Sequence, residues 1–365
     1  MIAALALLAW ICLACLHGKF WQKGPILPPA RPIALPSVAI VVPARDEAES
    51  IAPVIASLLA QDYEGQFRVV LVDDNSTDGT GDIARRLQGA ERLAVITGAA
   101  RPSGWAGKLW AVSQGVAATD EELVLLTDAD ITHDPRHLAT LVTKLTTSKL
   151  DMVSEMVELR CIDLAERALI PAFVYFFAML YPFARVNDPT SAVAGAAGGT
   201  VLIRRAALAR IGGIEAIKGE LIDDCALAGR VKPGGRIWLG HSMLARSIRP
   251  YPDWRDVWKM IARSAYVQLK LSPWLLAAST LGMALVFLVP PIAALLGYWA
   301  GILAWVLMAA TFLPTLRRFG LSPAWAPLLP VIALFYMAAT IGSAIDHHRG
   351  RGVVWKNRAY TESAS

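Results

Sequence analysis

The sequence predicts an α/β domain with a mostly parallel sheet, flanked by transmembrane helices at both ends of the chain. Short apolar runs alternate with segments of helical spacing, and this alternation is typical of βαβ units. Polar clusters follow several of the runs. Of the 365 residues, 55% are hydrophobic and only 18% are charged, which is too apolar for an ordinary soluble protein. The apolar excess lies at the two ends, so membrane helices are expected there.

Residues 1–17 are expected to form an uncleaved N-terminal membrane anchor. The stretch is apolar and uncharged up to Leu16, although it is shorter than the ~20 residues of a full span. A cleaved signal peptide is the alternative, but its basic residues would precede the apolar run, whereas Lys19 and Lys23 follow it. By the positive-inside rule the following chain, which begins with a Pro-rich linker over residues 18–36, lies in the cytoplasm.

Three transmembrane helices are expected over residues 271–346. The uncharged stretch 271–316 has about twice the length of one span and is interpreted as a hairpin of two helices. Residues 324–345 form one further span. The basic tail, residues 347–365, would then lie outside, against the positive-inside rule, so the sequence leaves its side open.

Two other segments are interpreted as helices at the membrane interface. Residues 168–184 are aromatic and nearly long enough to cross, but one crossing would separate Asp128 from Asp224, which the motifs below require in one site. Residues 251–270 combine tryptophans with basic side chains, as interfacial helices do. An ordinary amphipathic helix is an equally good interpretation of this second segment.

The central domain, residues 37–250, contains a regular series of elements. Continuous β-branched runs predict strands buried on both faces, and apolar residues at helical spacing predict helices. Strands and helices are expected to alternate, beginning with a strand, over residues 37–44, 47–61, 67–80, 81–88, 92–98, 109–119 and 122–130.

Acidic clusters follow three of the predicted strands, at residues 44–47, 73–75 and 128–130. Ligands of parallel sheets bind beyond the carboxyl ends of the strands, so the three clusters are expected to share one site. There is no Walker A sequence and no GxGxxG after the first strand. The four cysteines and six histidines show no metal-binding spacing.

Six ordered motifs resemble family 2 glycosyltransferases with the GT-A fold, a Rossmann-like α/β fold. The resemblance covers residues 37 to about 245. The motifs are "VVPARDE", "VVLVDDNSTDGT", "GKLWA", "LLTDAD", "GAAGGTVLIRRAAL" and "IDDCALAG". Together with the membrane segments, "GWAGKLWA" and "DWRDVWKMIARSAY" resemble the hopene-associated branch of that family. Each motif alone is weak, but their ordered combination is specific.

The resemblance implies a metal-dependent, inverting transfer of one sugar. Asp128 and Asp130 match the DxD motif, in which Asp130, together with Asp128, would bind Mg²⁺ or Mn²⁺ and neutralise the leaving diphosphate. Asp224 matches the general base, which removes the proton of the acceptor hydroxyl as its oxygen attacks the anomeric carbon. Asp223 stands at the position of the usual glutamate.

Further positions match donor and acceptor contacts of the family. Asp46 stands where the family often has Asn. Arg263 lies where processive synthases carry Gln-x-x-Arg-Trp, but the Gln and the Trp are absent here, which favours transfer of a single sugar. The resemblance leaves open which of Asp73 and Asp74 reads the base. The implied donor-binding residues are Pro43, Ala44, Arg45, Glu47, Asp73, Asp74, Lys108, Asp128 and Arg263, and the implied acceptor-binding residues are Gly198, Gly199 and Asp223.

The expected protein is a multi-pass enzyme of the inner membrane with a cytoplasmic catalytic domain. It would transfer a sugar from a nucleotide donor, expected to be UDP-linked, to a lipid acceptor, and no nucleic-acid partner is expected. The hopene-associated branch suggests a hopanoid acceptor, by resemblance alone. Two alternatives stay open: a polysaccharide synthase coupled to export, and a non-catalytic membrane scaffold that retains the fold.

Overall fold

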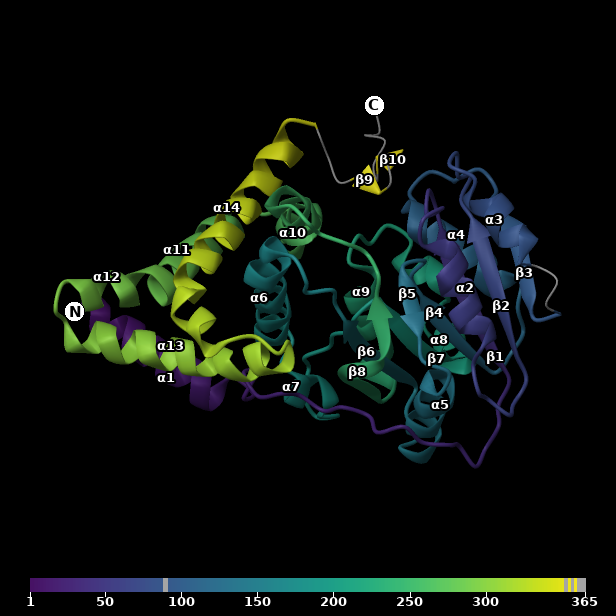
Figure 1. The fold of residues 1–365 in the computed structure, drawn as a ribbon, viewed down its shortest axis with the longest axis horizontal. Helices are drawn as coiled ribbons and strands as arrows, with labels where there is room; N and C mark the ends of the chain where they lie inside the picture. Colours follow the sequence, from purple (N-terminus) through teal and green to yellow (C-terminus); the bar gives the residue numbers. More distant parts are fainter. Residues whose placement is uncertain (88–90, 351–353, 356–357, 360–365) are drawn as a thin grey trace. The chain divides into compact units, whose positions relative to one another are not determined.

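The structure, a computed structural model, describes residues 1–87, 91–350, 354–355 and 358–359 (Figure 1). The chain divides into two compact units. The helical unit comprises Met1–Gly24, Arg160–Arg185 and Pro250–Val353, and the sheet unit comprises Pro25–Leu159, Val186–Arg249 and Val354–Ser365. The chain therefore passes repeatedly from one unit to the other.

The sheet unit contains an eight-stranded sheet with the order β3-β2-β1-β4-β7-β6-β8-β5. The pairs β1·β2, β2·β3, β1·β4 and β6·β8 are parallel, and β4·β7, β6·β7 and β5·β8 are antiparallel. The predicted mostly parallel sheet is thus confirmed. Its strands are β1 (Val38–Ala44), β2 (Phe67–Asp73), β3 (Leu93–Thr97), β4 (Leu123–Thr127), β5 (Ile131–His133), β6 (Met152–Glu158), β7 (Thr200–Arg204) and β8 (Ile237–Ser247). The short strands β9 (Val354–Trp355) and β10 (Arg358–Ala359) form a separate antiparallel pair.

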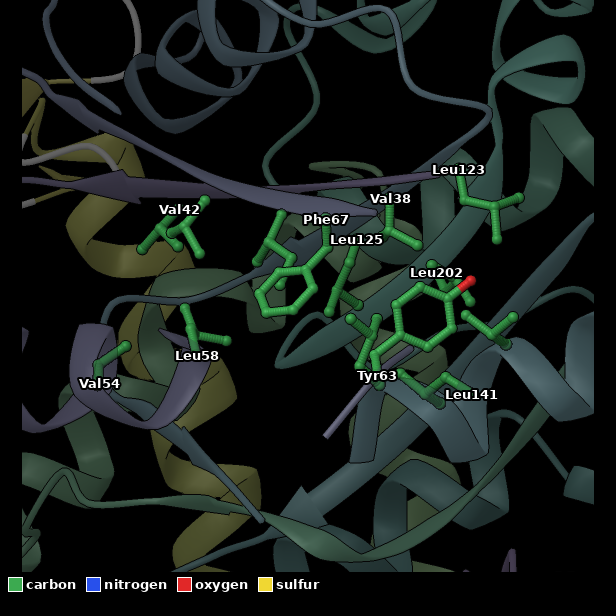
Figure 2. Packing of buried hydrophobic residues seen from close by; sticks show 14 of the residues in the cluster. Val38, Val42, Val54, Leu58, Tyr63, Phe67, Leu123, Leu125, Leu141 and Leu202 are labelled. Atoms are coloured by element: carbon green, nitrogen blue, oxygen red, sulfur yellow. The ribbon is translucent and has the colours of Figure 1, made fainter. Parts of the chain in front are cut away.

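Helices cover both faces of the sheet's parallel half. On one face Val69 and Leu71 of β2 belong to a large apolar cluster that also includes Leu58 and Leu141 from two helices (Figure 2). On the other face Val70 and Val72 pack against Ala111. Because both faces are buried, these strands are apolar throughout rather than alternating. The helices are α2 (Ile51–Leu59), α3 (Thr80–Arg86), α4 (Gly107–Ala117), α5 (His137–Thr147), α8 (Arg205–Arg210) and α9 (Asp223–Val231), with 3₁₀ turns η1 (Ile214–Ile217) and η2 (Lys232–Gly234).

The helical unit contains three helical stretches long and apolar enough to cross a membrane, by length and composition. They are Pro273–Leu295, Trp299–Arg318 and Pro323–His348, and they confirm the three apolar helices predicted over residues 271–346. The N-terminal helix has 15 residues and is shorter than a typical span. The elements are α1 (Ile2–Leu16), α6 (Leu164–Leu180), α10 (Trp254–Gln268), α11 (Pro273–Met283), η3 (Ala284–Leu288), α12 (Val289–Leu295), α13 (Trp299–Arg318), η4 (Pro323–Leu328) and α14 (Leu329–His348), with α7 (Phe183–Asn187) at the boundary between the units.

The predicted hairpin turns at Gly297, whose φ of 84° suits glycine. The prolines Pro290 and Pro291 lie instead in the first turn of α12, directly after the π-helical turn η3. The carbonyl of Val286 would bond to the N–H of residue 290 in an α-helix or of residue 291 in a π-helix, and neither proline has one. The indole Nε1–H of Trp10 in α1 donates to this carbonyl at 2.6 Å.

Most of the segment 168–184 belongs to one helix, and its placement at a membrane interface stays a prediction. The helix is α6, which begins earlier because Asp163 and Glu166 form a reciprocal capping box, and which ends before Pro182. It packs against α10, α13 and α14, and the hydroxyl of Tyr336 in α14 donates to the carbonyl of Leu169 at 2.9 Å. It is therefore an inner helix of the helical unit, and the domain predicted over residues 37–250 is interrupted by it.

The two remaining segments agree in part with their predictions. The amphipathic helix expected over residues 251–270 is α10, which is one turn shorter at its start. Of the basic tail, residues 347–365, the structure describes residues 347–350 and the short strands β9 and β10. The other tail residues lie outside the described residues.

Candidate active site

The carboxyl ends of β1, β2 and β4 bring the three acidic clusters to one edge of the sheet. In the parallel register Ala44, the last residue of β1, is level with Asp73, the last residue of β2. Val41 of β1 is level with Leu126, and β4 ends one residue later, directly before Asp128. The predicted convergence follows from this register.

A pocket at this edge contains six of the residues predicted for the site. The rest of its wall is mainly apolar, from residues of α4, η1 and α9, as in most ligand sites. An apolar wall strengthens the electrostatic interactions of the few polar groups that it surrounds. The six predicted residues are Pro43, Lys108, Asp128, Gly198, Asp223 and Asp224.

Lys108, at the start of α4, joins two of the predicted carboxylates. Its Nζ lies 2.8 Å from Oδ1 of Asp128 and 3.0 Å from Oδ2 of Asp223. Burial lowers the pKa of Lys108, but the two carboxylates outweigh this effect and raise it well above its ordinary value. Burial raises the pKa of Asp128, against the opposite effect of Lys108. Lys108 is thus a permanent cation that ties the tip of β4 to the start of α9.

Asp224, in the first turn of α9, has the properties of a proton acceptor at neutral pH. Burial, followed by the negative charge of Asp223, raises the pKa of Asp224 to about 7. A general base is most effective when its pKa lies near the working pH. A Cβ on Gly198 would lie 3.2 Å from Oδ2 of Asp224, so glycine allows the backbone to approach this carboxylate closely. The other Asp224 oxygen, Oδ1, accepts the N–H of Cys225 at 2.7 Å.

Asp130, the predicted metal ligand, is paired with Arg249. The Nε of Arg249 donates to Oδ2 of Asp130, and its Nη2 donates to Oε1 of Glu47 at 2.8 Å. Both acidic side chains are 13% exposed. The predictions missed Arg249, which follows the end of β8 by two residues and directly precedes Pro250. An arginine at the end of a strand is the signal that could have found it, but β8 itself was not predicted.

The carboxylates fit a divalent cation only together with a bound ligand. Among the residues that the structure describes, no three His, Cys, Asp or Glu side chains cluster closely enough to hold a metal. Asp128 and Asp130 offer the oxygen ligands that Mg²⁺ and Mn²⁺ prefer. Mg²⁺ commonly takes one or two carboxylates and completes its shell with phosphate and water. Asp128 and Asp130 would hold such an ion beside a diphosphate.

Asp73 and Asp74 are buried, 6% and 0% exposed, and both have partners within the protein. Asp73 accepts the N–H of Ser76 at 3.0 Å, as a turn-forming aspartate does. Arg45 Nη1 donates to the carbonyl oxygen of Asp74 at 2.5 Å. Asp46 has a φ of 50°, in the left-handed region that both Asp and Asn tolerate, so either residue suits this position.

Two predicted residues are placed differently from the others. A Cβ on Gly199 would lie 2.8 Å from Cγ1 of Val157, so packing against β6 already requires glycine there. Arg263 belongs to α10 of the helical unit, whereas all other predicted site residues belong to the sheet unit.

The sheet topology and the acidic edge define a GT-A-like α/β protein. A solved structure shows the same fold: the mannosyltransferase PcManGT from Pyrobaculum calidifontis, in complex with GDP-Man and Mn²⁺, superposes with a TM-score of 0.60 at 22% identity. The superposition covers 95% of this chain and 99% of that one. Residues 39–212 match the model of glycosyl transferase family 2.

Two curated relatives are similar to part of this chain. The dodecaprenyl-phosphate galacturonate synthase of Rhizobium johnstonii is 30% identical over 125 residues, which cover 33% of this chain and 36% of the relative. The beta-monoglucosyldiacylglycerol synthase of Nostoc sp. is 36% identical over 99 residues, 27% of this chain and 21% of the relative. The similarity thus spans about a third or less of these relatives.

Proposed function

We propose that this protein is an inverting glycosyltransferase that moves one sugar from a nucleotide donor, a UDP-sugar, to a lipid acceptor. The observation that carries the proposal is the pocket in which Lys108 joins Asp128 to Asp223, beside Asp224 with its pKa near 7. The match of residues 39–212 to the model of glycosyl transferase family 2 supports sugar transfer. The names of both curated relatives specify lipid products, and the three apolar helices suit a membrane-borne acceptor.

Each polar residue of the pocket would have its own role in a single displacement reaction. Asp224, deprotonated, accepts the proton of the acceptor hydroxyl while that oxygen forms a bond to the anomeric carbon. The bond from this carbon to the diphosphate oxygen breaks, the electron pair leaves with the diphosphate, and the anomeric configuration inverts. Lys108 holds Asp128 and Asp223 in place and stays protonated throughout. Gly198 leaves room for the acceptor beside Asp224.

A divalent cation would neutralise the charge that develops on the diphosphate. Asp130 and Asp128 are the residues proposed to hold it, and the structurally similar mannosyltransferase was solved with Mn²⁺ and GDP-Man. The donor contacts proposed around it are those implied by the family motifs, with Arg249 added because it touches both Asp130 and Glu47.

The proposed setting is the inner membrane, with the sheet unit in the cytoplasm, where nucleotide sugars are made. A hopanoid is one candidate acceptor, supported only by the resemblance of the membrane segments and of "GWAGKLWA" to the hopene-associated branch. A dodecaprenyl-type phosphate or a glycerolipid is supported instead by the relatives' names.

A donor-hydrolysis screen on the detergent-solubilised protein tests the proposal. UDP- and GDP-sugars are supplied with Mn²⁺, with Mg²⁺ or with EDTA, and release of nucleoside diphosphate is measured. The Asp224→Asn protein is the control for contaminating enzymes. Release from at least one donor, increased by lipid extract and lost in the control, is expected. Equal release by both proteins for every donor would contradict the proposal and favour a non-catalytic scaffold.

The length of the product separates the proposal from a polysaccharide synthase. Transfer of one sugar adds one hexose mass to the lipid acceptor in a mass spectrum. A ladder of products would instead favour the polymerase, against the missing Gln and Trp around Arg263.

A further inference from the structure

A chain of four buried polar side chains lies behind the pocket and outside the proposed chemistry. Thr127, His133, His137 and Glu155 are at most 5% exposed. The Oγ1 of Thr127 lies 3.0 Å from Nε2 of His133, the Nδ1 atoms of the two histidines lie 2.8 Å apart, and Nε2 of His137 lies 2.9 Å from Oε2 of Glu155. The chain therefore runs without a gap from β6 through α5 and β5 to the end of β4.

Counting hydrogens fixes the direction of this chain. The Thr127 hydroxyl donates its single hydrogen to the carbonyl of Gly199, at 2.8 Å. Thr127 must then accept a hydrogen from Nε2 of His133. The contact between the two Nδ1 atoms also needs one hydrogen, and the contact between His137 and Glu155 needs another.

Three hydrogens are thus required between the two rings and their partners, whereas two neutral imidazoles carry only two. The third hydrogen must lie between His137 and Glu155, and we place it on His137, as an imidazolium paired with the Glu155 carboxylate. His133 is then neutral, with its hydrogen on Nε2. Burial, and next the proximity of His137, lower the pKa of His133 well below its ordinary value, which agrees with this assignment.

We propose that His133, His137 and Glu155 are positioning residues for the transfer reaction. The buried ion pair of His137 and Glu155 directs a one-way hydrogen-bond chain that holds Thr127, and Thr127 in turn holds the carbonyl of Gly199.

The last bond of this chain, from Thr127 to the carbonyl of Gly199, joins residues next to two parts of the pocket wall. Thr127 directly precedes Asp128, the residue bound by Lys108. Gly199 directly follows Gly198, whose backbone lies against Asp224. The chain therefore sets the spacing between the carboxylate of the donor side and the proposed base.

Replacing the Glu155 carboxylate by a neutral amide should reverse the donor–acceptor direction in part of the hydrogen-bond chain. In Glu155→Gln no negative charge balances a second ring proton, and the chain reverses when the amide oxygen, rather than the amide N–H, faces Nε2 of His137. His137 then accepts from His133 at Nδ1, so Nε2 of His133 becomes an acceptor. The Thr127 hydroxyl turns to His133 and releases Gly199.

The ring protons can be counted directly. Nitrogen-15 NMR of the protein labelled at histidine distinguishes an imidazolium from a neutral ring, and single His→Asn variants assign the signals. For His133 and His137 together we expect three ring protons in the wild type and two in Glu155→Gln at pH 7.5. Two neutral rings in the wild type would overturn the buried ion pair proposed to direct the chain.

A matched pair of variants tests positioning. Thr127 and Thr200 face each other across β4 and β7, and both are buried, but the Thr200 hydroxyl has no hydrogen-bond partner among the described residues. Thr127→Val and Glu155→Gln should lower turnover about 10- to 100-fold, the range typical of outer-shell partners of active-site groups. The affinity for the nucleotide should stay unchanged, and Thr200→Val should leave both values unchanged.

Two outcomes would contradict the positioning role. Equal losses in Thr127→Val and Thr200→Val would mean that only packing matters. Wild-type turnover in Thr127→Val would separate the chain from the reaction, because this variant breaks the chain whichever way the amide of Glu155→Gln faces. The kinetic arm rests on the proposed function, whereas the proton count needs no substrate. A protein that transfers no sugar but holds three ring protons would overturn the function and leave the chain intact.

Discussion

At Asp224 the form proposed for catalysis, the ionised carboxylate, is the form that burial disfavours. Since its folded-state pKa is about 7, Asp224 is deprotonated, and could act as the proposed base, only as the pH rises through that value. We expect turnover to rise between about pH 6 and 8 and then level off. In Asp224→Asn turnover should fall by about 10²- to 10⁴-fold and lose this rise, with nucleotide affinity unchanged by calorimetry. If nucleotide affinity collapses instead, Asp224 belongs to the donor site.

The same raised pKa predicts a gain in stability for this variant. The ordinary value is 3.8, so the folded state holds the proton more tightly than the unfolded chain does. The stabilisation that protonated Asp224 contributes is complete below pH 3.8 and is lost as the pH rises through about 7. Asp224→Asn should therefore raise the thermal midpoint at pH 8 and leave it unchanged near pH 4. A lower midpoint at pH 8 would show that the charged form stabilises the fold.

Arg249 should compete with a metal for Asp130. It already neutralises Asp130 and Glu47, so a cation that binds Asp130 must displace it or add to its charge. We expect Arg249→Met to bind Mn²⁺ more tightly than the wild type in the absence of nucleotide, measured by calorimetry. Arg246→Met, which removes an exposed arginine from Glu158, is the matched control and should change nothing.

Asp130→Ala supplies the complementary result. Metal-dependent binding of UDP should vanish with an unchanged far-UV circular dichroism spectrum, because a carboxylate beyond a strand end contributes little to packing. Unchanged binding in this variant would exclude Asp130 as a metal ligand.

At the scale of the elements, α1 supplies a hydrogen bond that the helix of Pro290 cannot make for itself. Trp10→Phe would leave the carbonyl of Val286 without its indole donor in an apolar bundle. An unsatisfied buried acceptor costs about 1–3 kcal/mol, so we expect earlier thermal unfolding in detergent. Trp299→Phe, which changes an indole that is 68% exposed, should have no such effect. Adding Pro290→Ala to Trp10→Phe should restore stability, since residue 290 then has an N–H.

The sequence predicted those helices and strands whose apolar pattern lies within one short segment of the chain. The strands and helices from β1 to β4 lie within or beside the predicted ranges, because each apolar run is long and bounded by polar turns. By contrast, β8 contains Gly240, His241 and Arg246 and has no uniform apolar run. Its strand character comes from pairing with β6, 85 residues away in the chain for the pair of Met152 with Ile237, which no local pattern shows.

The site follows the same rule. Motif residues such as Lys108 and Asp128 could be placed because each stands at the end of a predicted element. The contact between Asp130 and Arg249 joins residues 119 positions apart, and that between His137 and Glu155 joins a helix to a strand with no spacing signature. Such pairs depend on tertiary packing and had to come from the structure.

At the scale of the whole molecule, the arrangement across the membrane is the prediction most open to test. If Asp128 and Asp224 share a compartment, the chain between them cannot cross once, so Thr147 and Ala192 should lie on the same side. Both are exposed positions on either side of α6. Single cysteines there, in a background without the four native cysteines, should both react with an impermeant reagent only in inverted vesicles. Labelling from opposite sides would contradict the topology and the single site.

The path of the chain also limits how the protein can be dissected. A fragment cut before Pro25 and after Arg249 would hold every strand from β1 to β8. It would also keep α6, whose Tyr175 is 1% exposed and bonds to Thr311 of the deleted α13. Removal of its neighbours would expose the apolar surface of this helix, and such a surface favours aggregation. A water-soluble version of the sheet unit therefore requires excising residues 160–185 and rejoining Leu159 to Val186, in addition to trimming both ends.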